Sequence, residues 1–264
     1  MKVINTTNLV AICTMFFLVA CSQPKDNAEA TESVVEETLP AETPAMNALS
    51  QEEIDQGWNS LFDGQSADHW RGYLMESFPD KGWKIHDGVL VLHKNTSNEE
   101  NWGGDIITKE QYENFELSLD FMLTDSTNSG ILYMVQEKEG DPIYYGAPEY
   151  QLLDDDLYLS LGENSIKDNQ KTASNYDMEA PSGDHLKPVG EWNVAKILVN
   201  EKHVEHWLNG AKVLEYDLES DKWNQQFQNS KFVDWPYAKI IKGHIGLQDH
   251  NHEISFRNIK IRNL

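Results

Sequence analysis

The stretch that decides the fold is Gly243 to Leu264, G-H-I-G-L-Q-D-H-N-H-E-I-S-F-R-N-I-K-I-R-N-L. In its first half Ile245 and Leu247 alternate with small or polar residues, which is the two-residue period of a strand with one buried face. The turn-forming residues Asp249 to Asn251 follow. The stretch therefore predicts a hairpin that closes a sheet and has a polar, histidine-rich tip.

The second half of this stretch changes phase. Ile254 and Phe256 share one phase, and the apolar residues after Asn258 share the opposite one. One inserted residue returns the later side chains to the same face, so we predict a β-bulge at Arg257 and Asn258. Arg257 is then expected to anchor the bulge or to pair with a carboxylate such as Glu149.

Outward from this stretch, the chain from Gly57 onward predicts short strands separated by polar turns. Phe115 to Phe121 alternates apolar and polar side chains throughout, and Asn209-Gly210 is a strong hairpin signal. Many short strands and few helical patterns predict an all-β sandwich of two antiparallel sheets. The further predicted elements are a hairpin over 83–93 turned at Asp87-Gly88, strands at 105–108, 130–135 (after an Asn128-Ser129 turn), 203–208 and 211–216, and a short helical piece near 157–161.

The first 20 residues predict a targeting segment. Lys2 precedes an apolar run that is too short to span a membrane as a mature helix, and the run ends in Leu18-Val19-Ala20-Cys21. This resembles the lipobox of a bacterial lipoprotein, which implies cleavage before Cys21, a lipid on its thiol and attachment to the cell envelope. The alternative is an ordinary secretory signal followed by a free cysteine. Cys13 would leave with the signal, so we expect no internal disulfide.

Residues 21–56 predict a disordered acidic tether, because they are rich in Glu, Ala, Thr and Pro and contain no aromatic residue. Residues 57–264 carry all the tryptophans and are long enough for one sizeable core, so we predict a single domain there. The formal net charge of the chain is −23, and the domain shows no cluster of Lys and Arg. Nucleic acid and anionic lipid surfaces are therefore poor candidate partners, and contact with a membrane is expected only through the lipid anchor.

The stretch Glu149 to Asp156, E-Y-Q-L-L-D-D-D, carries the most chemical information. In a strand Glu149 and Gln151 share one face and Leu152 takes the other, so we expect the two polar side chains to line an exposed face. The stretch loosely resembles the E-x-D-x-x-E motif of laminarinase-type jelly rolls. Gln151 replaces an acid of that motif, which argues against a retaining glycosidase with two carboxyls about 5 Å apart.

Several motifs in the same order resemble the 3-keto-disaccharide hydrolase family over the whole of residues 57–264. They are L-F-D-G (61–64), N-S-G-I (128–131), E-Y-Q-L-L-D (149–154), K-P-V-G-E-W-N (187–193), V-E-H-W-L-N-G (204–210) and G-H-I-G-L-Q-D-H followed by F-R-N-I-K-I. The resemblance implies a concanavalin-like jelly-roll sandwich, often in a lipoprotein, that cleaves glycosides already oxidised at C3. Asn251 stands where the family usually has glycine.

A carbonyl at C3 explains which side chains such an enzyme needs. It acidifies the proton on C2, so a base can remove that proton and the oxygen on C1 can leave from the resulting enolate. The reaction needs a base near C2, a stabiliser for the enolate oxygen and an acid for the departing oxygen. A divalent metal bound by the substrate's oxygens would provide the second of these. The catalytic candidates are Glu149, His250 and His206.

Each catalytic candidate has a structural alternative. Glu149 would otherwise be a solvated strand residue, and His250 an exposed turn histidine. His206 lies in phase with Val204 and Leu208, which favours a hydrogen-bonded core histidine.

The candidates for substrate binding are Gln151, Glu205, Trp207, Gln248 and Arg257. Trp207 would stack on a sugar ring, or simply pack on the sandwich. Residues 154–156 would hold calcium, or form a solvated acidic loop. His250 and His252 would chelate a metal, although their spacing fixes no third ligand.

Two classes of function remain from the sequence. The first is a 3-keto-glycoside hydrolase or lyase with a carbohydrate substrate. The second is a non-catalytic, lectin-like glycan-binding lipoprotein, and a conventional glycosidase ranks third.

The lipobox predicts that Cys21→Ser releases the protein from the membrane fraction without altering the folded domain. Fractionation followed by immunoblotting measures this, with Cys13→Ser as the matched control because Cys13 lies within the signal. Unchanged membrane association of Cys21→Ser would contradict a lipid anchor.

Overall fold

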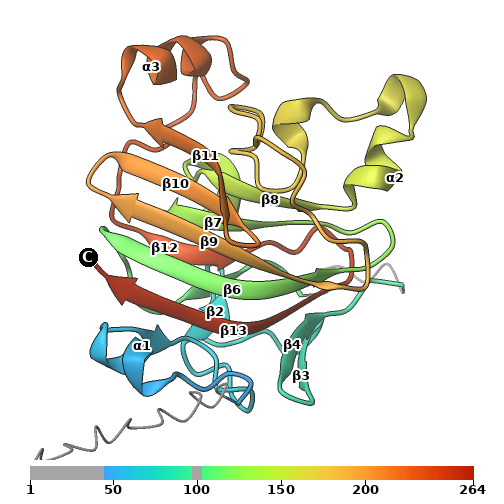
Figure 1. Ribbon diagram of the computed structural model, residues 1–264, viewed down its shortest axis with the longest axis vertical. Coiled ribbons are helices and arrows are strands. Elements are labelled where there is room, and N and C mark those ends of the chain that lie inside the picture. The colour runs from blue at the N-terminus through green and yellow to red at the C-terminus, as the bar shows by residue number, and fades with distance from the viewer. Residues whose placement is uncertain (1–44, 97–102) are drawn as a thin grey trace, which may run out of the picture. The chain divides into compact units, whose positions relative to one another are not determined.

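The computed structural model describes residues 45–96 and 103–264, and its domain consists of two antiparallel sheets (Figure 1). The predicted signal, Cys21 and most of the predicted tether lie outside the described residues. In the described part of the chain, no helix is long and apolar enough to cross a membrane. The architecture is the all-β sandwich of two antiparallel sheets that the sequence predicts.

The larger sheet has eight strands. In spatial order they are β11 (Ala211–Asp217), β10 (His203–Leu208), β9 (Trp192–Asn200), β6 (Phe115–Leu123), β13 (Ile254–Asn263), β4 (Val89–Leu92) and β3 (Trp83–His86), with β1 (Asn59–Ser60) paired to β13.

The smaller sheet has five strands. Their order is β2 (Trp70–Gly72), β5 (Ile106–Thr108), β12 (His244–Leu247), β7 (Asn128–Val135) and β8 (Glu149–Leu153). The described helices are α1 (Gln51–Asp55), α2 (Asp155–Leu159) and α3 (Asp221–Gln228), with the short 3-10 turns η1 (Ile143–Tyr145), η2 (Gly162–Asn164) and η3 (Asp168–Gln170).

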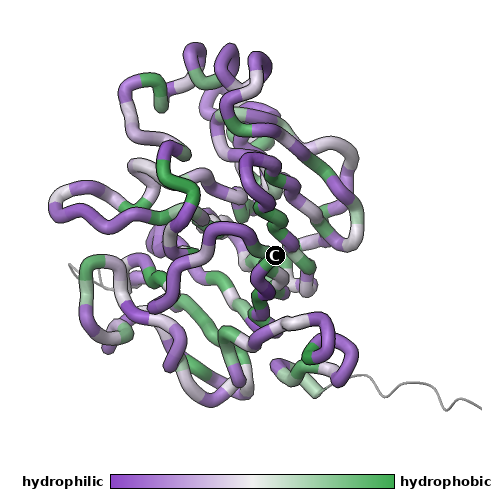
Figure 2. Tube along the Cα trace, turned by 90° about the vertical axis from the view of Figure 1, so that its left-hand side faces the viewer, coloured by the Kyte–Doolittle hydropathy of each residue, from purple (hydrophilic) through white to green (hydrophobic). Residues whose placement is uncertain are grey.

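The core lies between the two sheets. Leu117 and Leu119 of β6 face it from the larger sheet, and Tyr150 and Leu152 of β8 face it from the smaller one; all four are buried. In Figure 2, much of the apolar (green) tube lies in the interior, and most of the outer loops are polar (purple). Each fully buried large apolar side chain contributes about 1.5–3 kcal/mol. The alternation of β6 therefore determines which of its faces is inside, as predicted.

The final stretch is not a hairpin, which corrects the prediction. β12 belongs to the smaller sheet and β13 to the larger one, so residues 248–253 form an arch from one sheet to the other. Both strands still bury the predicted residues, because Ile245 and Leu247 reach the shared core from one side and Ile254 and Phe256 from the other. The period of a strand identifies its buried face but not its sheet.

The predicted bulge in β13 is confirmed. The pairing of β13 with β6 shifts register between Arg257 and Lys260, and Asn258 has a φ of 53°. Arg257 Nε lies 3.1 Å from Asp120 Oδ2, and its guanidinium lies 4.0 Å from the ring centre of Trp192. Arg257 thus anchors the bulge on the outer face of the larger sheet and does not pair with Glu149.

Both predicted two-residue hairpins are confirmed. β3 and β4 are joined by Asp87 and Gly88, with φ of 48° and 77°, and β10 and β11 are joined by Asn209 and Gly210, with φ of 50° and 85°. A positive φ at both central residues is typical of the turn that matches strand twist.

The ordered chain begins earlier than the predicted tether boundary at residue 56. Ser50 caps α1 with a capping box to Glu53. Asn47 is buried, and its backbone N–H and side-chain oxygen exchange two hydrogen bonds of 2.7 Å with Asn258. Its side-chain amide donates to Gly88 O at 2.8 Å. These polar contacts, not apolar composition, order the segment.

Some elements were missed by the sequence patterns. β9 and α3 were not predicted, and Asn128-Ser129 lies inside β7 instead of forming the turn before it. The turn before β7 is formed by residues 124–127, where the Thr127 N–H donates to Thr124 O at 3.1 Å.

The core assignment of β6 predicts that Leu119→Ala lowers the free energy of unfolding by about 2–5 kcal/mol, because Leu119 has no exposed surface. Urea unfolding followed by circular dichroism measures this. Ser118→Ala, on the outer face of the same strand, is the control and should change stability by less than about 0.5 kcal/mol. Equal effects of the two variants would contradict the assignment of the faces.

Candidate active site

The candidate site is built on β8, the edge strand of the smaller sheet. β7 pairs with one side of it, and residues 173–176 cover the other side. Ala173 N–H donates to Gln151 O at 2.9 Å, and Tyr176 N–H donates to Glu149 O at 3.0 Å. The edge is thereby closed, and Tyr176 is brought beside Glu149.

Glu149 and Gln151 point away from the core, as predicted, but they are not exposed. Their exposed fractions are 8% and 3% because loops cover this face of the sheet. The expectation of an open polar face is therefore wrong: period two showed the direction of the side chains but could not show the covering loops.

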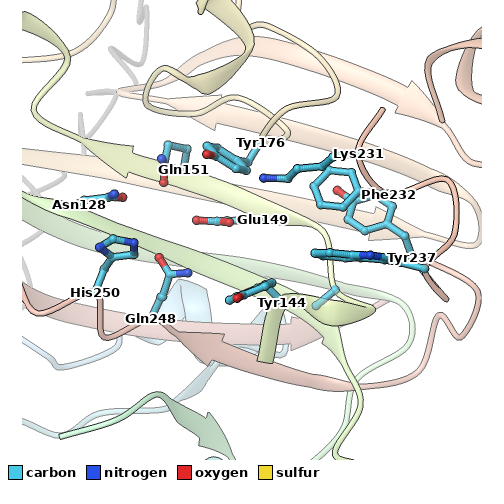
Figure 3. A pocket seen from close by; sticks show the side chains of 12 residues that line it. Asn128, Tyr144, Glu149, Gln151, Tyr176, Lys231, Phe232, Tyr237, Gln248 and His250 are labelled. Atoms are coloured by element: carbon cyan, nitrogen blue, oxygen red, sulfur yellow. The ribbon is translucent and has the colours of Figure 1, made fainter. Parts of the chain in front are cut away.

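A pocket of about 280 Å³ lies over these two residues (Figure 3). This is near the lower end of small-molecule sites, about 300 Å³, and is suited to a single sugar ring. Its lining residues are Asn128, Tyr144, Ala147, Glu149, Gln151, Tyr176, Lys231, Phe232, Trp235, Tyr237, Gln248 and His250.

Aromatic side chains form one wall of the pocket. Phe232 stacks on Tyr237 at 4.3 Å between ring centres, and Tyr237 stacks in turn on Trp223 of α3 at 5.9 Å. Trp235 stacks on Tyr144 at 6.1 Å. The stacks fix the segment between α3 and β12 against the sandwich, so the wall is preformed.

The carboxyl of Glu149 lies directly over Gly130 of β7. A Cβ atom added at Gly130 would be 2.3 Å from Glu149 Oε1, which is closer than any real contact. Burial raises the pKa of the Glu149 carboxyl to about 8, and the Lys231 ammonium opposes part of this rise. Glu149 is consequently a proton-carrying group near neutral pH, as acid–base catalysis requires.

Gln248 and His250 reach the pocket from the arch after β12. The arch is held by Asp249, whose backbone N–H donates to Asp105 Oδ1 at 2.8 Å and whose Oδ2 accepts from Gly104 N–H at 2.9 Å. Asn251 has a φ of 61°, a left-handed conformation that asparagine tolerates. Asparagine can thus occupy the position at which the sequence resemblance implies glycine.

Asp105, which accepts the hydrogen bond from the arch, also has a shifted pKa. Burial raises the pKa of its carboxyl to about 7; the N–H of Asp249 opposes the rise and the Asp249 carboxylate adds to it.

The His250 ring stacks on the His252 ring, with 5.8 Å between the ring centres. His250 itself is exposed at the pocket mouth.

His206 is not brought to the pocket. It is fully buried between the sheets, where Nδ1 donates to Ala173 O at 3.0 Å and Nε2 accepts from the Tyr133 hydroxyl at 2.9 Å. Burial lowers the pKa of the imidazole to about 4, although the bond to Ala173 opposes this. The core alternative for His206 is confirmed, and the structure gives no support to a catalytic role.

Glu205 and Trp207 also lie elsewhere, on the outer face of the larger sheet. Trp207 Nε1 donates to Glu205 Oε2 at 2.7 Å, and Lys196 Nζ lies 4.0 Å from the centre of the Trp207 ring. The predicted sugar-binding role of this pair is not supported, because the ring carries a lysine and lies on a different sheet from the pocket.

A preformed metal site is not found in the pocket. Across residues 45–96 and 103–264, the one cluster of three suitable side chains is His203, Glu205 and Glu215, whose carboxylates are bound by Lys212. The pocket offers only one carboxyl and one imidazole from these residue types.

The acidic run after β8 has structural partners. Asp154 caps α2 by accepting from Leu157 N–H at 3.1 Å, and Asp155 accepts from Thr172 N–H at 2.9 Å. Burial raises the pKa of Asp155 to about 6. Asp154 and Asp155 are thus hydrogen-bonded to the backbone of neighbouring segments.

Comparison with known proteins identifies the family. Residues 57–262 match the model of the 3-keto-alpha-glucoside-1,2-lyase-like domain. A 3-keto-disaccharide hydrolase of Bacteroides thetaiotaomicron is 35% identical, over 93% of both chains. The chain belongs to the 3-keto-disaccharide hydrolase family.

Solved structures agree with membership of the 3-keto-disaccharide hydrolase family. A candidate glycosyl hydrolase from Parabacteroides distasonis superposes with a TM-score of 0.76 at 34% identity and covers 83% of this chain and 100% of its own. A second one from the same organism gives a TM-score of 0.58 at 29% identity, over 78% of this chain and 99% of its own.

Most of the pocket wall was missed by the sequence patterns. The residues are Asn128, Tyr144, Ala147, Tyr176, Lys231, Phe232, Trp235 and Tyr237. One signal was available: residues 223–237 contain five aromatic side chains in a segment without strand periodicity. Such a segment must pack somewhere, and here it packs over the outer face of a sheet.

The buried acid predicts a pH-dependent effect of Glu149→Gln on stability. The folded state binds the Glu149 proton more tightly than the unfolded state, so its contribution is complete below the ordinary pKa of 4.5 and is lost as the pH rises through about 8. Relative to wild type, Glu149→Gln should gain up to roughly 4 kcal/mol between pH 5 and pH 9.

Urea unfolding at both pH values measures this difference, and the exposed Glu110→Gln is the control. Asp155 titrates in all three proteins and cancels in the comparison, whereas the Asp105 charge raises the pKa of Glu149 and so forms part of the measured difference. A wild-type-to-variant difference that stays constant with pH would show that Glu149 is not held as the neutral acid.

Proposed function

We propose that this chain cleaves glycosides oxidised at C3, by removing the C2 proton and eliminating the substituent on C1. The observation that carries the proposal is the buried Glu149 carboxyl at the floor of an aromatic pocket in a 3-keto-disaccharide hydrolase fold. The name of the Bacteroides thetaiotaomicron relative supports the choice of substrate class.

In this proposal Glu149 is the base. A proton next to a ketone is only weakly acidic, so a carboxylate of ordinary strength removes it poorly. A carboxyl whose pKa is about 8 is a stronger base and is still partly ionised near neutral pH. Only the substrate with a C3 carbonyl has such a proton, which separates it from the unoxidised parent.

His250 is the proposed acid for the departing oxygen. It lies at the exposed mouth of the pocket, where the aglycone would leave into solvent. Gln151 and Gln248 offer amide groups to the hydroxyls of the ring, and the aromatic wall offers apolar faces to its C–H groups. The sugar ring is thus held between Glu149 and the stacked side chains.

The lipobox at Cys21 supports a further part of the proposal, that the enzyme is held at the bacterial cell envelope by a lipid anchor.

The proposal predicts that Glu149→Gln abolishes cleavage of a 3-keto glucoside, with a loss of at least about 10²–10⁴-fold. The variant should still fold, because glutamine has the same shape. In wild type, log kcat/KM should rise with pH and level off above about pH 8, where the carboxylate predominates. Release of glucose or of a chromogenic aglycone measures both.

Three further results decide between the alternatives. Solvent deuterium should enter C2 of recovered 3-keto substrate in wild type and not in Glu149→Gln. A rate that falls above pH 8 would make Glu149 the acid instead of the base. Binding without cleavage would indicate a lectin, and cleavage of the unoxidised glucoside would indicate a conventional glycosidase; either would refute the proposal.

His250→Ala tests the second residue. It should reduce cleavage of an alkyl glycoside strongly and cleavage of a 4-nitrophenyl glycoside weakly, because nitrophenolate leaves without protonation. His252→Ala, its stacked neighbour, is the matched control.

A further inference from the structure

Lys231 is the one cationic side chain among the residues that line the pocket in the described chain. It comes from the segment after α3, and Figure 3 shows its ammonium directed into the pocket on the side of Glu149 and Gln151. The chain as a whole has a formal net charge of −23. A cation placed beside a buried carboxyl is therefore not explained by general surface composition.

The position of the ammonium is fixed by aromatic rings. Lys231 Nζ lies 4.2 Å from the centre of the Tyr176 ring and 5.0 Å from that of Phe232. The negative faces of aromatic rings attract a cation at such distances. Phe232 is held in turn by its stack on Tyr237, and Tyr176 by its backbone bond to β8. The cation is thus preorganised by elements on both sides of the pocket.

The N–H groups of the Lys231 ammonium are also available to bind a ligand. The Asp177 carboxylate lies 3.9 Å from Nζ, which is beyond hydrogen-bond distance, and 44% of the Lys231 side chain is exposed. The Tyr237 hydroxyl, by contrast, already donates to Asn175 Oδ1 at 2.8 Å. Lys231 combines a positive charge with an N–H free to turn toward a ligand.

We propose that Lys231 is a catalytic residue that binds the substrate oxygen on C3 and stabilises its negative charge in the enolate; this inference rests on the proposed function. Glu149 takes the C2 proton, the electrons of that bond form the C2–C3 double bond, and the carbonyl pair moves onto the C3 oxygen beside the ammonium. The charge then returns to re-form the carbonyl, the C1–C2 double bond forms, and the C1–O bond breaks. The departing oxygen receives a proton from His250 or water.

The assignment follows from where charge develops. A preorganised donor accelerates a reaction when it meets charge that is larger in the transition state than in the substrate. The C3 oxygen of a ketone becomes an oxyanion in this reaction, whereas a C3 hydroxyl in the unoxidised sugar acquires no charge. Lys231 would therefore favour the 3-keto sugar in catalysis more than in binding.

Lys231→Met tests the proposal because it keeps the apolar stem against Tyr176 and Phe232 and removes only the charge. With a 3-keto 4-nitrophenyl glucoside, kcat should fall by on the order of 100-fold or more while KM changes little. Deuterium exchange at C2 should slow by a similar factor. Lys231→Arg should recover part of the rate, and Lys239→Met, an exposed lysine of the same segment, should behave as wild type.

Other outcomes overturn the proposal. Wild-type kcat in Lys231→Met would make the lysine a packing residue, and normal C2 exchange with slow cleavage would assign it to the leaving group. Trapping of the substrate on Lys231 by borohydride would indicate an imine in place of an enolate held by charge. Lys231→Gln provides the same test if the methionine variant does not fold.

The two proposals fail separately. If wild type neither exchanges C2 hydrogen nor cleaves the 3-keto glucoside, the proposed function and the role of Lys231 are both refuted. If Glu149→Gln is inactive and Lys231→Met is fully active, only the role of Lys231 is refuted.

Discussion

The carboxyl of Glu149 fits only because its neighbour on β7 has no side chain. Gly130 leaves the space in which the carboxyl lies, and the loops over this face close that space from water. An ionised carboxylate is costly to bury, whereas the neutral acid is not, so the same enclosure that shapes the pocket sets the proton affinity of its central group. The shape of the pocket and the raised pKa of Glu149 therefore both result from the enclosure of this carboxyl.

The remaining structure makes this enclosure durable. Residues 173–176 close the edge of β8 by backbone hydrogen bonds, and the segment after α3 is fixed by a run of stacked rings. The arch from β12 to β13 is tied to Asp105 and carries Gln248 and His250 to the opposite rim. Each of these segments is irregular, but each is immobilised by contacts that the sandwich provides.

The sequence predicts those structural elements that depend only on a few adjacent residues. Alternation in β6, the turns at Asp87-Gly88 and Asn209-Gly210, and the phase change in β13 all appear as predicted, because side-chain period and turn conformation are properties of a few adjacent residues. Glu149, Gln151, Gln248 and His250 were identified for a similar reason together with the family resemblance, and the structure brings them to one pocket.

The sequence could not predict relations between distant segments. The arch was mistaken for a hairpin because two strands in different sheets bury the same core with the same alternation. The sequence patterns also point to His206, Glu205 and Trp207 as site residues, although their strand lies in the other sheet. Lys231 and its aromatic neighbours were missed, since loop residues have no period and their destination depends on tertiary packing.

The clamp between Asn47 and the bulge at Asn258 also has a directional consequence. It fixes the start of the described chain to the outer face of the larger sheet, whereas the pocket opens on the outer face of the smaller one. A label or fusion attached near Asn47 would therefore lie on the face opposite the pocket and leave its opening unobstructed.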